Sequence, residues 1–111
     1  MTTLELGITK TVAGVGVDVN EEGFFLHPDQ WTEAMVPELA REEGIGELTD
    51  QHWTVIRFMR REYEATGSGP TVRVLGKTSG VSIKDLYQLF PRGPAKVAAR
   101  IAGIPKPRGC I

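Results

Sequence analysis

The chain has 111 residues, of which 41% are hydrophobic and 24% charged, a composition typical of one small soluble domain. No apolar run approaches the roughly 18 residues that a membrane-spanning helix needs, and the start, MTTLELGITK, lacks the basic and apolar stretches of a signal peptide. We therefore expect a single domain over residues 1–111 that works in the cytoplasm. One cysteine excludes a disulfide within the chain.

The net charge of −1 conceals an asymmetry between the two parts of the chain. Residues 1–69 carry five cationic side chains against 13 acidic ones, a net of −8, whereas residues 70–111 carry eight against one, a net of +7. A basic C-terminal third indicates an anionic partner, such as an acidic protein face, RNA or DNA. The alternative is that the two parts neutralise each other within the fold.

The first elements that the sequence predicts are a β-hairpin and a helix. VGVDVNEEGFFL reads as a strand, a turn over residues 20–23 and a second strand over residues 24–26. In residues 27–44, Asp29 is a candidate N-cap, but Pro37 is incompatible with a straight helix because it lacks an N–H and clashes with the preceding turn. We expect either a kink there or a helix that begins near Pro37.

The following segments predict four more helices. Residues 48–69 form the strongest candidate, with Thr49 or Asp50 as its cap and an apolar stripe through His52, Val55 and Met59. Residues 70–91 match a helix, a tight turn and a second helix, which is the helix-turn-helix pattern, and residues 94–102 form a last compact helix. The predicted class is a mostly α fold with a small N-terminal β-hairpin (α+β).

The last residues, GIPKPRGCI, predict an arm over about residues 103–111 that carries the single cysteine, Cys110. Pro105 and Pro107 forbid a helix and favour an extended path. Lys106 and Arg108 favour the reactive thiolate, whereas the terminal carboxylate opposes it. A mobile arm would hold the thiol at high effective concentration near any docked protein. The alternative is an ordinary, inert cysteine.

The C-terminal stretch LYQLFPRGPAKVAARIAGIPKPRGCI closely resembles the signature of the DsrC/TusE sulfur-carrier family. LTDQHWTVIRFMRREY resembles the family's Leu-Thr-x-x-His-Trp helix, and NEEGFF resembles its turn, so the resemblance runs from about Val15 to Ile111. Members that work with dissimilatory sulfite reductase carry a second cysteine eleven residues before the last, where this chain has Ala99. The resemblance is therefore to the single-cysteine, TusE-like members.

The resemblance implies that Cys110 accepts a persulfide sulfur from a donor sulfurtransferase and passes it to an acceptor, such as a tRNA thiolase. No cofactor is implied beyond this covalently bound sulfur. We expect the basic residues around the arm to meet the partner or the arm itself, although each could equally be a solvated side chain. These residues are Arg92, Lys96, Arg100, Lys106 and Arg108.

Two other functions stay open at the level of the sequence. The helix-turn-helix pattern and the basic C-terminal third fit a DNA-binding regulator, and a lone thiol fits a redox-sensing module. A metal site is not expected, because His27 and His52 lie far apart in the sequence without ligand-spaced cysteines.

Overall fold

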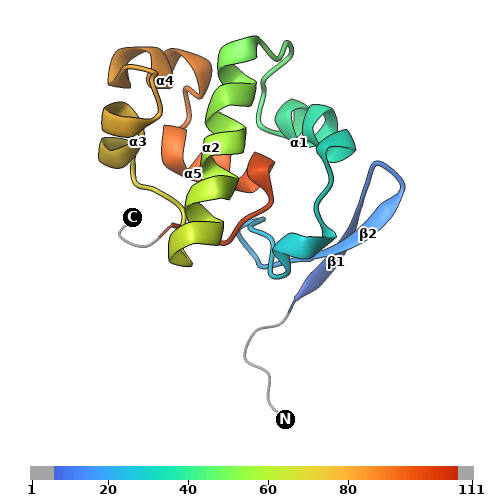
Figure 1. Ribbon diagram of the computed structural model, residues 1–111. Coiled ribbons are helices and arrows are strands. Elements are labelled where there is room, and N and C mark those ends of the chain that lie inside the picture. Colours follow the sequence, from blue (N-terminus) through green and yellow to red (C-terminus); the bar gives the residue numbers. More distant parts are fainter. Residues whose placement is uncertain (1–6, 108–111) are drawn as a thin grey trace.

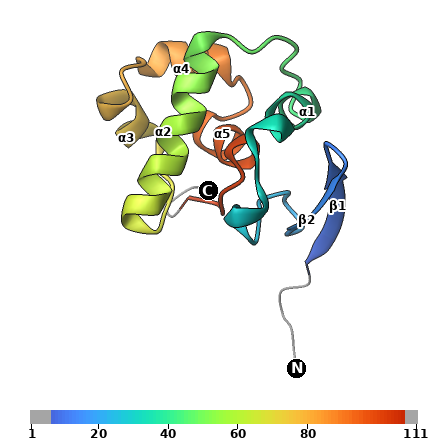
Figure 2. The ribbon, with the colours of Figure 1, turned by 45° about the vertical axis from the view of Figure 1, so that its right-hand side comes forward.

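The computed structural model describes residues 7–107 and shows a bundle of short helices with a hairpin at its side (Figures 1 and 2). The predicted class, mostly α with an N-terminal hairpin, is confirmed. The elements in chain order are β1 (Ile8–Val12), β2 (Val15–Val19), the 3₁₀ turns η1 (Pro28–Gln30) and η2 (Glu33–Met35), α1 (Val36–Glu42), α2 (Asp50–Thr66), α3 (Val72–Thr78), α4 (Ile83–Leu89) and α5 (Pro94–Ala102).

The hairpin pairs β1 with β2 in antiparallel register, from Ile8 opposite Val19 to Val12 opposite Val15. The two-residue turn between them has φ of 51° at Ala13 and 79° at Gly14. Positive φ at both central residues gives the turn the twist that a tight hairpin requires.

The sequence-based choice of hairpin partner was wrong. Beyond Val19, the Asn20 side chain accepts a hydrogen bond from the backbone N–H of Phe24, and the chain turns back as predicted. The predicted second strand, however, contributes only one bridge, between Val19 and Phe25. Phe24 and Phe25 are both buried, at 1% and 0% exposure. A half-buried strand would send consecutive side chains to opposite faces. These two rings instead fill the core together, and pairing with β2 falls to Ile8–Val12.

Helix α1 begins at Val36 with Pro37 in its first turn, where the missing N–H costs nothing. The expectation of a helix that starts near Pro37 is confirmed. Asp29 is not its N-cap, because Asp29 lies inside η1, which is a separate 3₁₀ turn.

Helix α2 is capped by Thr49, whose side chain accepts from the backbone N–H of His52, while the His52 ring accepts from the backbone N–H of Thr49. This reciprocal arrangement is a capping box. The other ring nitrogen of His52 lies 3.0 Å from the Leu89 carbonyl. His52 thus ties α2 to the end of α4 and belongs to the core, as do Val55 and Met59 on the predicted stripe.

Helices α3 and α4 form the predicted helix-turn-helix pair. Thr71 caps α3 and Ser82 caps α4, and Gly80, with φ of 89°, makes the turn between them. Each helix buries one leucine inward, Leu75 or Leu86, at 0% exposure.

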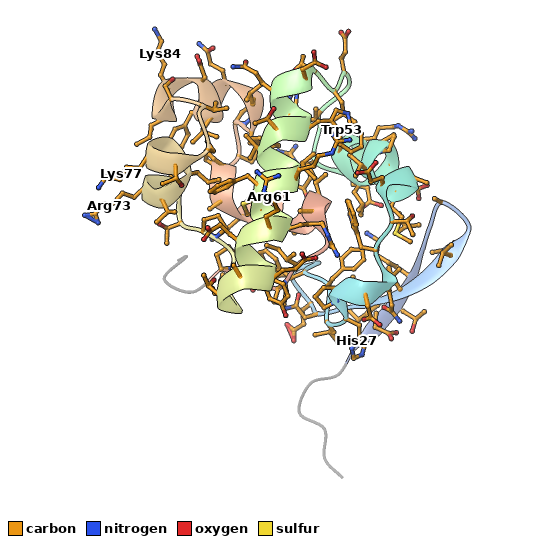
Figure 3. All side chains as sticks on the ribbon, in the orientation of Figure 1. His27, Trp53, Arg61, Arg73, Lys77 and Lys84 are labelled. Carbon is orange, nitrogen blue, oxygen red and sulfur yellow. The ribbon has the colours of Figure 1, made fainter. Side chains whose placement is uncertain are left out.

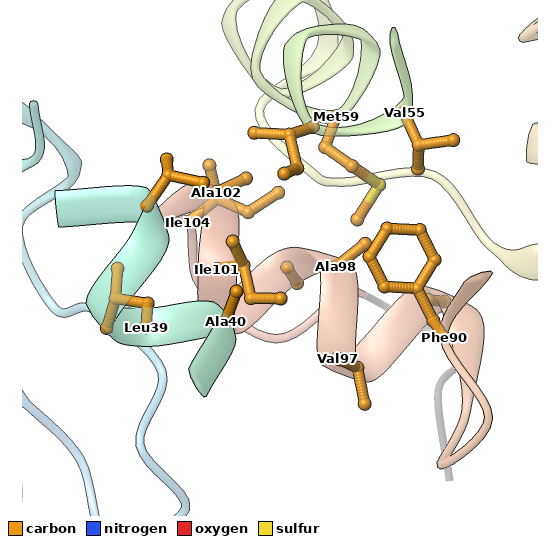
Figure 4. Close-up of a cluster of buried hydrophobic side chains, with 14 of the residues drawn as sticks. Leu39, Ala40, Val55, Met59, Phe90, Val97, Ala98, Ile101, Ala102 and Ile104 are labelled. Carbon is orange, nitrogen blue, oxygen red and sulfur yellow. The ribbon is translucent and has the colours of Figure 1, made fainter. Parts of the chain in front are cut away.

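Helix α5 lies at the centre of the bundle and contacts α1, α2, α3 and α4. Its small residues let the neighbouring helices approach, and Ile101 fills the space between them (Figure 4). Within residues 7–107, no helix combines the length and apolarity needed to cross a membrane. Of the helices in residues 7–107, α5 has the largest share of buried residues, and the segment that leads to Cys110 starts from its end.

Candidate functional site

The site is built around the end of α5, where the C-terminal segment begins. Gly103 adopts φ of 68° and ends the helix, and the N–H of Ile104 then donates to the Ala99 carbonyl at 3.1 Å. A Cβ at position 103 would run into the indole of Trp31. Glycine is required here both by the left-handed backbone and by the close approach of this ring.

Two side chains from distant segments donate hydrogen bonds to the backbone carbonyls at this helix end. The Trp31 indole N–H donates to the Ile101 carbonyl at 2.9 Å. Arg60 donates to the Ala102 carbonyl at 2.7 Å and to the Pro28 carbonyl at 3.2 Å, and its guanidinium lies 4.1 Å from the centre of the Trp31 ring. A cation at a helix C-terminus also complements the helix dipole.

Partial burial lowers the pKa of Arg60, with the opposing influence of Glu64 raising it. A guanidinium stays charged across the physiological pH range despite such a shift. Sequence analysis missed Arg60, because it falls outside the apolar stripe of α2. The stripe identifies the buried face of a helix, but it does not reveal that a carbonyl 42 residues away needs a donor.

The segment after α5 packs against the body as far as Pro107. Ile104 and Pro107 are buried, and both meet the bare backbone of Gly69. A Cβ on Gly69 would lie 2.7 Å from Ile104 Cδ1 and 3.3 Å from Pro107 Cγ. We call this contact the Gly69 seat. For a mobile arm to begin at residue 103, Ile104 and Pro107 must first leave the Gly69 seat.

The predicted basic residues lie in different surroundings. Arg100 forms a two-pronged ion pair with Glu43, at 2.8 and 3.2 Å, and Lys106 lies 3.4 Å from Glu22. Both acids belong to the acidic N-terminal part, so these two pairs join the oppositely charged parts of the chain. Arg92 is exposed and Lys96 half-buried. Cys110 and Arg108 lie outside the described residues.

A cavity of about 320 Å³ adjoins Arg100 between the hairpin, the turn after β2 and α1. Its walls include the Arg100–Glu43 pair and a second pair, Lys10–Glu42, at 2.6 Å. Much of the charge around the cavity is thus neutralised within the protein. Among residues 7–107, no group of three or more histidine, cysteine or acidic side chains is arranged to hold a metal ion.

Comparison with known proteins identifies the family. The chain matches the family "DsrC like protein" over residues 11–111. It belongs to the DsrC/TusE family. The sulfite reductase, dissimilatory-type subunit gamma of Nitratidesulfovibrio vulgaris is 40% identical over 91% of this chain and 96% of that protein. Sulfurtransferase TusE of Yersinia pseudotuberculosis is 43% identical over 86% of this chain and 94% of that protein.

Solved structures share the fold described above. The crystal structure of dissimilatory sulfite reductase I (DsrI) superposes with a TM-score of 0.84 at 39% identity and covers 94% of this chain and 100% of that one. The NMR structure of Allochromatium vinosum DsrC gives 0.77 at 39% identity and covers 96% and 100%. Both kinds of relative, sulfurtransferase and sulfite reductase subunit, match at similar identity.

Ala99 is a second position to consider. By the resemblance described above, it stands where the family members that work with dissimilatory sulfite reductase carry a second cysteine. Ala99 is fully buried in α5, and its carbonyl accepts the hydrogen bond from Ile104. The methyl side chain here fits the tight packing around α5 and offers no sulfur chemistry.

Proposed function

We propose that this protein is a cytoplasmic sulfur carrier that loads one sulfur atom onto Cys110 and delivers it to a partner protein. The observation that supports this is the combination of DsrC/TusE membership with a single cysteine. Because Cys110 is the only thiol of the chain, any persulfide that the protein carries must form there.

The proposed step is an exchange at sulfur without net oxidation. The Cys110 thiolate attacks the outer sulfur of a donor cysteine persulfide, a new S–S bond forms on Cys110, and the donor's S–S bond breaks. The donor leaves as a thiolate, and the proton of the transferred sulfur is exchanged with solvent. Delivery reverses these roles: the thiolate of an acceptor cysteine attacks the outer sulfur of the Cys110 persulfide, the S–S bond on Cys110 breaks, and Cys110 leaves as a thiolate. Neither step needs a cofactor.

The single cysteine favours one kind of sulfur acceptor over another. Two cysteines in one chain can close a disulfide and so release a bridging sulfur internally, whereas the alanine at position 99 removes this route. We therefore propose that the acceptor is a sulfurtransferase-type partner, as in the relay toward tRNA 2-thiouridine. Relatives named "Sulfurtransferase TusE" match at up to 43% identity and support this choice.

Intact-mass spectrometry tests the proposal. The wild type and Cys110→Ser are incubated with a cysteine desulfurase, free cysteine and a persulfide-carrying sulfurtransferase. The expected result is a gain of one sulfur atom on the wild type only, reversed by reductant. No gain with several competent donors, or the same gain on Cys110→Ser, would contradict it. Reversible oxidation of Cys110 without sulfur gain would instead indicate a redox sensor.

A further inference from the structure

The outer face of the α3–α4 pair exposes large apolar side chains. Two large hydrophobic residues of α4 are exposed there, Ile83 at 46% and Tyr87 at 50%. Leu75 and Leu86 already fill the inward side of these helices. Ile83 packs across the bare backbone of Gly76, so the two helices meet there and their outer faces adjoin. Ile83 and Tyr87, four residues apart, share one side of α4.

Three cations flank these residues. Arg73, Lys77 and Lys84 are exposed and lie along the same outer edge of the molecule, away from α2 (Figure 3). None of the three forms an ion pair with another residue in the range 7–107. The only acidic residue of α3 and α4 is Asp85. The face therefore combines an apolar centre with an uncompensated positive rim.

We propose that this α3–α4 face, defined by Ile83 and Tyr87 with Arg73, Lys77 and Lys84, docks the protein that exchanges sulfur with Cys110. The partner has an apolar centre surrounded by acidic side chains. Protein interfaces concentrate aromatic and apolar residues at the centre and opposite charges around them. An exposed tyrosine is among the residues that most often dominate binding energy at such a centre.

Nucleic acid fits this face less well. A recognition helix reads bases with polar side chains at its N-terminal end. The Ser82 hydroxyl at that end of α4 accepts from the backbone N–H of Asp85 and serves as the helix cap. Among the exposed side chains that follow on α4, Ile83 and Tyr87 present mainly apolar surface, and only Lys84 and Gln88 are polar.

The face also lies beside the route to the thiol. The last described residue, Pro107, packs against Gly69, which directly precedes Pro70 and the Thr71 cap of α3. A protein docked on the start of α3 would thus lie close to Pro107, three residues before Cys110 in the sequence. This link to Cys110 rests on the proposed function, whereas the docking face itself rests on the exposed side chains.

Two captures in cells of the organism that makes this protein identify the partner. A photo-crosslinking amino acid replaces Tyr87 in one strain, and Cys110 is trapped as a mixed disulfide in another. The expected result is that one and the same protein is captured by both routes. The crosslinker at Arg41, an exposed position on α1, should not capture it. No adduct at position 87, an adduct with RNA or DNA, or equal capture from position 41 would overturn the proposal.

The affinity of the identified partner is then measured in a Cys110→Ser background, so that the thiol plays no part. We expect Lys77→Glu/Lys84→Glu and Tyr87→Ala each to raise the Kd by roughly tenfold or more. The control Arg41→Glu/Arg61→Glu changes the net charge equally, elsewhere on the surface, and should leave the Kd within about twofold. Equal effects of both charge reversals, or none, would refute the docking face. Failed sulfur loading with these Kd changes intact would refute only the proposed function.

Discussion

Replacing Arg60 with methionine should destabilise the protein more than the same replacement of any exposed arginine. The change keeps the apolar stem but removes hydrogen bonds to the Ala102 and Pro28 carbonyls and the contact with the Trp31 ring. A hydrogen bond from a charged group contributes about 1.5–3 kcal/mol, and a cation–π contact about 0.5–2 kcal/mol. Because the three contacts share one group and do not add, we expect a loss of about 2–4 kcal/mol.

Urea unfolding followed by circular dichroism measures this loss, provided that the m-value is unchanged. Arg61→Met is the matched control, since Arg61 is exposed and lies 5.9 Å from the Phe58 ring centre; it should cost less than about 0.5 kcal/mol. Arg60→Lys should lie in between, because an ammonium keeps the charge but not the two-pronged geometry. A loss below about 1 kcal/mol for Arg60→Met, or one equal to the control, would refute the role of Arg60 at the end of α5.

Two further changes test the Gly69 seat and the Arg100–Glu43 pair. Gly69→Ala places a methyl group 2.7 Å from Ile104 Cδ1, so we expect the free energy of unfolding to fall by about 1–2 kcal/mol and hydrogen exchange at the Ile104 amide to become faster. The control Gly46→Ala, which has open space around it, should change neither quantity. An unchanged Ile104 exchange rate in Gly69→Ala would disprove the seat. Arg100→Gln should cost about 1–3 kcal/mol, because it leaves the partly buried Glu43 carboxylate without its cation; if stability is unchanged while partner affinity falls, Arg100 is a binding residue instead.

The helices were predictable because their signals are local. The stripe through His52, Val55 and Met59 and the cap lie within one stretch of chain. The structure buries the stripe as expected and has Thr49, one of the two predicted candidates, as the cap. The same holds for Pro37, whose missing N–H limits where α1 can begin. Periodicity and capping depend only on neighbours along the sequence, so they survive without knowledge of the fold.

The hairpin partner and the surroundings of α5 were not predictable in this way. The turn at Ala13 places a non-glycine residue at φ of 51°, which few sequence rules anticipate. The bonds from Trp31 and Arg60 to the end of α5 span 70 and 42 residues. Gly69 is the last residue of the segment predicted as the long helix, and nothing beside it in the sequence indicates that its missing side chain makes room for Ile104. Such features depend on which backbone lies opposite, and only the folded structure reveals this.

The Gly69 seat determines how far the Cys110 thiol can reach and, with that, its local concentration near the body of the protein. Cys110 follows Pro107 by three residues, and a chain spans at most about 3.3–3.6 Å per residue, so a seated Pro107 confines the thiol to within roughly 11 Å. Release back to Gly103 extends that radius to about 25 Å. The accessible volume grows roughly tenfold, and the local concentration of the thiol falls by the same factor, from roughly 0.3 M to roughly 0.03 M. The seat therefore raises the frequency with which the thiol meets a nearby partner but shortens its reach. With Pro107 in the seat, the thiol favours a partner that already lies against the body. With the segment released, the thiol can reach a recessed acceptor.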